Sequence, residues 1–109
     1  MMRPLSVVLR EEAASDLSEI YDYVYRASLD PLTAERFTTR ILDFCETIGT
    51  MPRGGRPRDD LLAGLRTFPF ERRTVIAYRV VDDVVEITNI FHGGRDFEAL
   101  YRQAPGKAD

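Results

Sequence analysis

The sequence predicts an α+β fold in which an N-terminal strand and a two-helix antiparallel hairpin precede a three-stranded antiparallel meander packed on the helices. Two observations predict it. Apolar residues recur at helical spacing through residues 11–48, and after residue 64 the pattern changes to short β-branched and aromatic runs. The chain has 109 residues, 44% of them hydrophobic, so we expect a single domain over residues 1–109 with a flexible tail at 104–109.

The first element is a short strand at residues 5–9, and a helix follows from Glu11. The apolar face of this helix is built from residues three or four positions apart, namely Ala13, Leu17, Ile20, Tyr21, Val24 and Ala27. Asp30 and Pro31 provide an N-cap and a first position for a second helix. Its apolar face comprises Ala34, Phe37, Ile41, Phe44 and Ile48. Gly49 is placed to end it, and the short link between the helices predicts an antiparallel hairpin.

In the second half of the chain, the sequence predicts a loop at residues 51–64. Three strands follow, at residues 65–70, 74–81 and 84–91. Pro69 cannot donate a ladder hydrogen bond, so its strand should lie at an edge or carry a bulge. Asp82 and Asp83 predict a two-residue hairpin turn. Apolar residues occupy both faces of the last two strands, which indicates that both faces are covered. A partner protein, or residues 97–101 folding back, would provide the second cover.

Composition excludes several classes of function. The single cysteine, Cys45, leaves no internal disulfide and no Cys-based zinc site within one chain. His92 and the carboxylates show no recognisable ligand spacing, so we expect no metal. Walker, dinucleotide and Gly-x-Ser-x-Gly patterns are missing, so we expect no cofactor. Apolar runs are too short for a membrane span. Charged residues at positions 10–12 occur before the apolar region of a signal peptide could form, so we expect a cytoplasmic protein.

Positive charge is concentrated in the middle of the chain. Residues 51–81 carry seven Arg against three acidic residues, whereas the net charge of the chain is −3. Arginine binds phosphate and carboxylate groups bidentately, so a basic block in an acidic chain indicates a site for an anionic partner. The residues expected to bind that target are Arg56, Arg66, Arg72, Arg73, Arg79, His92 and Arg95. The alternative is that these arginines are solvated surface groups, some of them paired with Glu71, Glu86 or Asp96.

An ordered set of motifs carries a family resemblance. The motifs are Ala14-Ser15-x-Leu17-x-x-Ile20-x-x-Tyr23, Ala34-x-x-Phe37-x-x-x-Ile41, Pro52-x-x-Gly55-Arg56-Pro57, Gly64-Leu65-Arg66, Tyr78-Arg79-Val80 and Ile90-Phe91-His92-Gly93-Gly94-Arg95-Asp96. In this order they resemble the ParE branch of the RelE/ParE toxin superfamily. The resemblance implies the toxin of a type II toxin–antitoxin pair, a ParD-like antitoxin as partner, and DNA gyrase as target.

The RelE branch of the superfamily offers an alternative activity, which is cleavage of mRNA on the ribosome. In that case the resemblance implies catalytic roles for His92, Arg79 and Arg95, with no further catalytic residue singled out. The sequence lacks the lysine cluster common in RelE-like nucleases, which favours a gyrase inhibitor that is not an enzyme. A helical adaptor without toxicity would leave the basic block unexplained.

The antitoxin is expected to cover apolar side chains of the two helices. Tyr21, Tyr23 and Tyr25 span too wide an arc for one face within the chain to bury all of them. A disordered antitoxin tail that folds on this surface would gain apolar burial. The residues expected to bind the antitoxin are Leu17, Ile20, Tyr21, Val24, Phe37 and Ile41.

Overall fold

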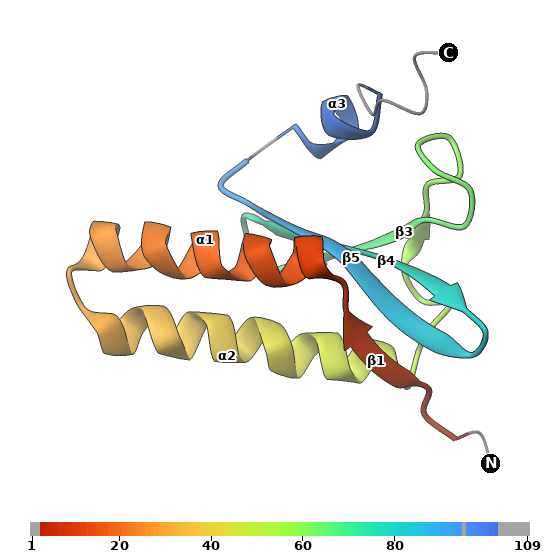
Figure 1. Ribbon diagram of the computed structural model, residues 1–109, viewed down its shortest axis with the longest axis horizontal. Helices are drawn as coiled ribbons and strands as arrows, with labels where there is room; N and C mark the ends of the chain where they lie inside the picture. Colours follow the sequence, from red (N-terminus) through yellow and green to blue (C-terminus); the bar gives the residue numbers. More distant parts are fainter. Residues whose placement is uncertain (1–2, 95, 103–109) are drawn as a thin grey trace.

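The structure, a computed structural model, describes residues 3–94 and 96–102 (Figure 1). Its elements are β1 (Ser6–Leu9), α1 (Glu11–Ser28), α2 (Pro31–Ile48), β2 (Arg56–Pro57), β3 (Arg66–Phe70), β4 (Thr74–Val81), β5 (Val84–His92) and α3 (Phe97–Arg102). This order confirms the predicted α+β fold. The tail predicted at residues 104–109 lies outside the described residues.

The strands form one five-stranded sheet in the order β1-β5-β4-β3-β2. The predicted meander is present as β3, β4 and β5, which pair antiparallel. A further strand joins it at each edge. β1 pairs parallel with β5, and the two-residue β2 pairs antiparallel with β3 inside the segment predicted to be a loop. Past the end of β2, β3 is itself an edge, and Pro69 lies there as predicted.

The helical hairpin is set by its link and by its end. The Asp30 carboxylate caps α2, since it accepts hydrogen bonds from the Leu32 N–H at 3.2 Å and the Thr33 hydroxyl at 2.7 Å. Gly49 follows α2 with right-handed backbone, and its small size is required because a Cβ there would collide with the Leu5 carbonyl oxygen. The hairpin tip projects beyond the sheet (Figure 1). No helix in the described ranges is long and apolar enough to cross a membrane.

The predicted turn between β4 and β5 is confirmed. Asp82 and Asp83 have φ values of 51° and 62°, which is the left-handed pair that a two-residue type I′ turn requires. Aspartate tolerates this backbone region better than most residues because its short side chain bonds locally. The strands on either side therefore leave the turn in register, with Val81 opposite Val84.

One face of the sheet packs against the helical hairpin and holds the main core. Ile41, Cys45 and Ile48 of α2 meet Ile76 and Tyr78 of β4 there, and all five are at most 1% exposed. Full burial of such side chains is worth roughly 1.5–3 kcal/mol each, so this face carries much of the stability.

A β-bulge in β5 changes which residues face the helices. Tyr78 pairs with Ile87 and Ala77 pairs with Asn89, which leaves Thr88 as an extra residue. Ile87 and Ile90 consequently both join the helix-facing core, although an unbroken strand would place them on opposite faces. The same shift turns Phe91 to the other face.

The second face of the sheet carries a smaller core, built from Leu61, Leu65, Ala77 and Phe91. Phe97 and Tyr101 of α3 pack on Phe91, with ring centroids 5.4 and 6.2 Å away. Of the two covers expected from the sequence, the fold-back of residues 97–101 is the one present in the structure. No partner is needed to explain the apolar residues on this face.

Arg58 holds α3 in place. Its guanidinium donates hydrogen bonds to Asp60 at 2.8 and 3.0 Å and to Glu98 at 2.6 Å, and it lies over the Phe97 ring. These bonds lower the pKa of Asp60 and of Glu98. Arg58 is 7% exposed, so one arginine of the basic block is structural and is not available to a target.

Candidate functional site

His92 lies at the end of β5, between the two long helices. Its Nδ1 atom is 2.8 Å from the Thr74 hydroxyl, and its ring centroid lies 5.6 Å from that of Tyr23 and 5.2 Å from that of Phe37. Burial lowers the pKa of His92, the nearby Arg73 lowers it further, and Glu71 partly opposes both. The ring is therefore neutral near pH 7 and is packed among aromatic side chains.

We expect the stability of the chain to rise with pH as His92 loses its proton. The unfolded chain binds a proton at His92 with a pKa of about 6.5, and the folded chain binds it only at lower pH. Between these two values the unfolded state holds more protons, so lowering the pH destabilises the fold. His92 is the only histidine, so its titration can be followed directly by NMR.

Urea unfolding measured from pH 5 to 7, set against the same series for His92→Gln, isolates this contribution. The variant should lack the part of the pH dependence that comes from His92. A folded-state pKa above 6.5, or identical profiles for the two proteins, would contradict the neutral, packed ring.

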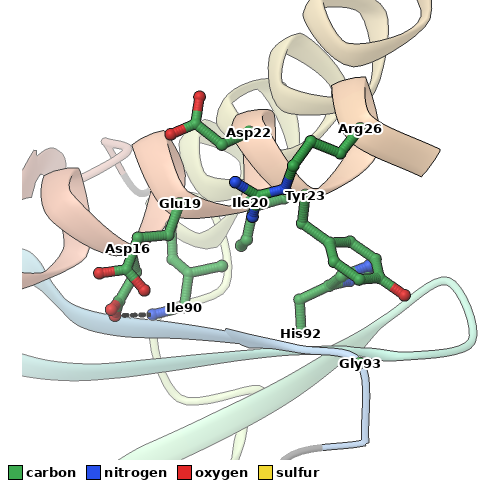
Figure 2. Close-up of a pocket in the computed structure, with 9 residues that line it drawn as sticks. All are labelled: Asp16, Glu19, Ile20, Asp22, Tyr23, Arg26, Ile90, His92 and Gly93. Atoms are coloured by element: carbon green, nitrogen blue, oxygen red, sulfur yellow. Dashed lines mark hydrogen bonds between the residues drawn. The ribbon is translucent and has the colours of Figure 1, made fainter. Parts of the chain in front are cut away.

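Two hollows open on either side of His92. The larger is a cleft of about 540 Å³ between α1 and the end of β5 (Figure 2). Its lining residues are Asp16, Glu19, Ile20, Asp22, Tyr23, Arg26, Ile90, His92 and Gly93. The second is a hollow of about 400 Å³ between the helices, lined by Val24, Thr33, Arg36, Phe37, Arg40 and His92.

Asp16 anchors α1 to the β5 bulge. Its Oδ2 atom accepts hydrogen bonds from the Ile90 N–H at 2.9 Å and from the Asn89 side-chain amide at 3.1 Å. The first of these bonds is drawn in Figure 2. Asp16 is not among the site residues expected from the sequence, in which its position in the first turns of α1 is the only signal for it. These two bonds hold α1 against the end of β5, and these are the two elements that line the cleft.

Arg66 acts as a brace. Its guanidinium donates to the carbonyl oxygens of Arg53 at 2.9 Å and Gly55 at 2.8 Å. The Gly55 N–H in turn donates to the Tyr78 hydroxyl, which donates to the Pro52 carbonyl. A Cβ at Gly55 would lie 2.5 Å from that hydroxyl oxygen, so glycine is required. This network fixes the loop before β2. It also engages the Arg66 guanidinium, which the sequence analysis expected to bind the target.

The sheet separates the arginines that the sequence grouped together. Arg66 pairs with Tyr78, whose ring faces the helices, so Arg66 lies on that side too. Arg79 follows Tyr78 in β4 and therefore points to the opposite face. Arg56 shares that opposite face, because it pairs with Thr67, which pairs with Ala77. Arg66 is therefore separated by the sheet from Arg56 and Arg79.

The remaining target candidates lie at the β3–β4 turn. Arg72 and Arg73 are exposed there, and Arg73 donates to the Gly93 carbonyl at 2.9 Å. Arg95 lies outside the described residues. Two of the acidic partners expected from the sequence pair with other arginines, since Glu71 pairs with Arg40 and Glu86 with Arg10. The third, Asp96, accepts a hydrogen bond from the Ala99 N–H at 3.2 Å.

The residues expected to bind an antitoxin divide into core and surface. Ile20 and Ile41 are 5% and 0% exposed, so the assignment of these two to a partner surface is corrected: they belong to the intrachain core. Leu17, Val24 and Phe37 are partly buried against that core, and Tyr21 is half-buried. The exposed aromatic groups of α1 are Tyr23 and Tyr25, at 49% and 43%.

Other chemistry finds little support in the described part of the chain. Burial raises the pKa of the Cys45 thiol to about 12, which keeps it protonated and unreactive. Within residues 3–94 and 96–102, no three His, Cys, Asp or Glu side chains gather as metal ligands do.

Comparison with known proteins places this fold. A sequence model of the family described as "ParE toxin of type II toxin-antitoxin system, parDE" matches residues 7–97. The chain belongs to the ParE toxin family. The match covers both long helices and all five strands except Ser6, the first residue of β1. The ParE-family resemblance seen in the ordered motifs is therefore confirmed.

Solved structures with the same fold include toxin–antitoxin systems. This ParE-family chain matches a chain of the "Chromosomal ParDE TA system from P. aeruginosa" with a TM-score of 0.70 and 26% identity, covering 81% of this chain and 95% of the other. It also matches a chain of the RelBE2 toxin–antitoxin complex from Mycobacterium tuberculosis, with a TM-score of 0.63 and 22% identity, covering 84% and 100%. The second match shows a shared fold. A comparison with curated protein sequences finds no significant match.

Proposed function

We propose that this chain arrests growth by binding DNA gyrase in the cytoplasm, without cleaving RNA, and that a ParD-like antitoxin neutralises it. The observation that carries the first part is the separation of His92 from Arg79 by the sheet. Cleavage of a phosphodiester needs an acid–base group and cations that converge on one phosphate. Here the His92 ring faces the helices and Arg79 faces away from them.

The family supports the antitoxin as partner. The solved structure matched at 26% identity comes from a ParDE system of P. aeruginosa, and the chain belongs to the ParE toxin family. On this chain, the proposed antitoxin surface is the exposed side of α1 around Tyr23 and Tyr25, with Tyr21, Leu17, Val24 and Phe37 at its margin. A folding antitoxin segment would bury these aromatic groups and gain the free energy that offsets its ordering.

The decisive experiment compares two readouts after induction of the toxin. We expect the toxin to inhibit the supercoiling activity of purified gyrase and to induce a DNA-damage response in cells. Rapid cleavage of mRNA with normal supercoiling would overturn the proposal in favour of the ribosome-dependent endoribonuclease. Co-expression of the product of the neighbouring gene should restore growth and co-purify with the toxin, and an isolated toxin unaffected by that product would argue against the partner.

We expect His92→Gln to arrest growth about as well as the wild type. Glutamine keeps hydrogen-bonding capacity toward Thr74 but cannot exchange a proton near neutral pH, so only acid–base chemistry would be lost. A catalytic role would make the loss roughly 10²–10⁴-fold. Growth at matched expression is measured, with mRNA integrity followed in the same cells.

Arg95→Ala is the companion variant, proposed from the sequence to weaken arrest more than His92→Gln does, because binding limits the effect. A folded but harmless His92→Gln protein, beside a wild type that cleaves mRNA, would contradict the binding mechanism.

A further inference from the structure

The smaller core covers only part of the second face of the sheet. Its aromatic centre, Phe91, lies at the end of β5, where Phe97 of α3 stacks on it. Figure 1 shows α3 well apart from β1 and from the turn between β4 and β5. Three valines lie at those two places, and they are called the valine row below: Val8, Val81 and Val84. Neither apolar core of the described residues includes them, and Val8 is 45% exposed.

The strand register brings the valine row together on the second face. Val81 pairs with Val84 on either side of the turn, and Val8 pairs with the residue two positions beyond Val84 in β5. Val7 and Val85 pack in the helix-facing core, so alternation along each strand turns Val8 and Val84 to the opposite face. Opposite and diagonal positions on one face of a sheet are neighbours, so the three side chains form one aliphatic surface.

Charged side chains border the valine row. Arg79 is two residues before Val81 in β4 and therefore shares its face. The residue opposite Arg79 is Glu86, whose carboxylate accepts a hydrogen bond from Arg10 at 3.1 Å. The ion pairs of the described residues do not involve Arg79. Its guanidinium can therefore bind a carboxylate of another molecule in a bidentate manner.

We propose that the valine row and Arg79 together bind a protein segment of the growth-arrest target, in which an aliphatic side chain lies next to a carboxylate. This inference rests on the proposed function, under which the segment belongs to gyrase itself. The aliphatic side chain packs on the three valines, and the carboxylate pairs with Arg79 beside them. Apolar burial at the centre supplies affinity, and the ion pair at its margin sets the orientation.

Charge complementarity selects a protein segment over the DNA that gyrase holds. Asp82 and Asp83 are exposed at the turn beside the valine row, and Glu86 lies on the same face as Arg79. These carboxylates repel a phosphate backbone. Valine side chains also provide no flat aromatic surface for the stacking of bases. A segment that carries both an aliphatic and an acidic group matches the valines and Arg79 at once.

Titration calorimetry of the full chain with purified gyrase, in the absence of DNA, measures the affinity. We expect Val8→Thr/Val84→Thr to weaken binding about tenfold, because each hydroxyl is buried against an aliphatic group without a hydrogen-bond partner. Val8→Thr alone should weaken it about threefold by the same cost. Its matched control is Val80→Thr, at a valine that is 38% exposed on the opposite face of β4, and this variant should bind as the wild type does.

Threonine keeps the shape and the strand preference of valine, so the fold should persist in these variants. Urea unfolding of each variant checks this. If the double variant is unfolded, Val8→Thr at its exposed position carries the test.

Growth arrest at matched expression separates failure of this inference from failure of the proposed function. Equal gyrase affinity of the folded valine variants and the wild type, or gyrase binding that requires DNA, would overturn the inference and leave gyrase as the target. A wild type that does not bind gyrase would overturn the proposed function. In that case, loss of arrest in the valine variants but not in Val80→Thr would still support the valine row as the surface that binds the target.

Discussion

Ile41→Ala is expected to lower the free energy of unfolding by about 2–5 kcal/mol, the usual cost of removing a large aliphatic side chain from a packed core. Ile41 is 0% exposed and packs in the core between the helical hairpin and the sheet. The loss combines the apolar area returned to water on unfolding with a cavity that the rigid sheet below cannot fill. Urea unfolding followed by circular dichroism measures the change.

The neighbouring residue supplies the control. Leu42 is 38% exposed on the same helix, and Leu42→Ala should cost less than about 1 kcal/mol. The comparison also tests the corrected role of Ile41. A variant at Ile41 that kept full stability but bound the antitoxin poorly would return this residue to the partner surface that the sequence suggested.

The helical hairpin could be predicted in detail because its signals are local. Apolar spacing, the Asp30 cap, Pro31 at the first helical position and Gly49 at the end each act within a few residues. The Asp82-Asp83 turn is local in the same sense, and it fixes the register of the two strands beside it. Such features depend on neighbours in sequence, so one chain read alone reveals them.

The sheet edges could not be predicted because they depend on distant partners. β1 is a plausible strand in isolation, but its parallel pairing with β5 joins residues nearly eighty positions apart, such as Ser6 and Val84. β2 has only two residues and no periodicity of its own. Its existence depends on the Arg66 brace and on Tyr78, which hold the preceding loop against the sheet.

Which residues meet at the candidate site could not be predicted from the sequence for a similar reason. Counting alternate residues from Val85 would place His92 on the face opposite the helices, together with Arg79. The bulge at Thr88 reverses that count, and His92 instead meets Phe37 on the helix side. One inserted residue therefore separates two of the three groups that a nuclease mechanism would have used.

Arg56 and Arg79 both lie on the second face of the sheet, opposite the helices. A double variant at these two positions is therefore the sharpest test of target binding. Arg56 is exposed and Arg79 is half-buried, and the ion pairs in the described chain do not involve either one. Arg66 is unsuitable for this test, because its loss would release the loop carbonyls that it braces. Charge reversal at Arg79 is unsuitable as well, since a glutamate there would oppose Glu86 across the strands.

We expect Arg56→Gln/Arg79→Gln to lower the affinity for gyrase roughly 100-fold and to abolish growth arrest at matched expression, because each guanidinium supplies charge-assisted hydrogen bonds to an anionic target. Glutamine keeps part of the aliphatic stem, and Arg10 still pairs with Glu86, so folding should persist. Antitoxin binding through α1 should persist as well, because both arginines lie on the other face of the sheet. The control Arg3→Gln/Arg36→Gln removes the same charge from exposed positions elsewhere and should stay toxic. Full toxicity of the Arg56 and Arg79 variant in the supercoiling assay and in cells would mean that the basic block is ordinary solvated surface and that gyrase is bound elsewhere.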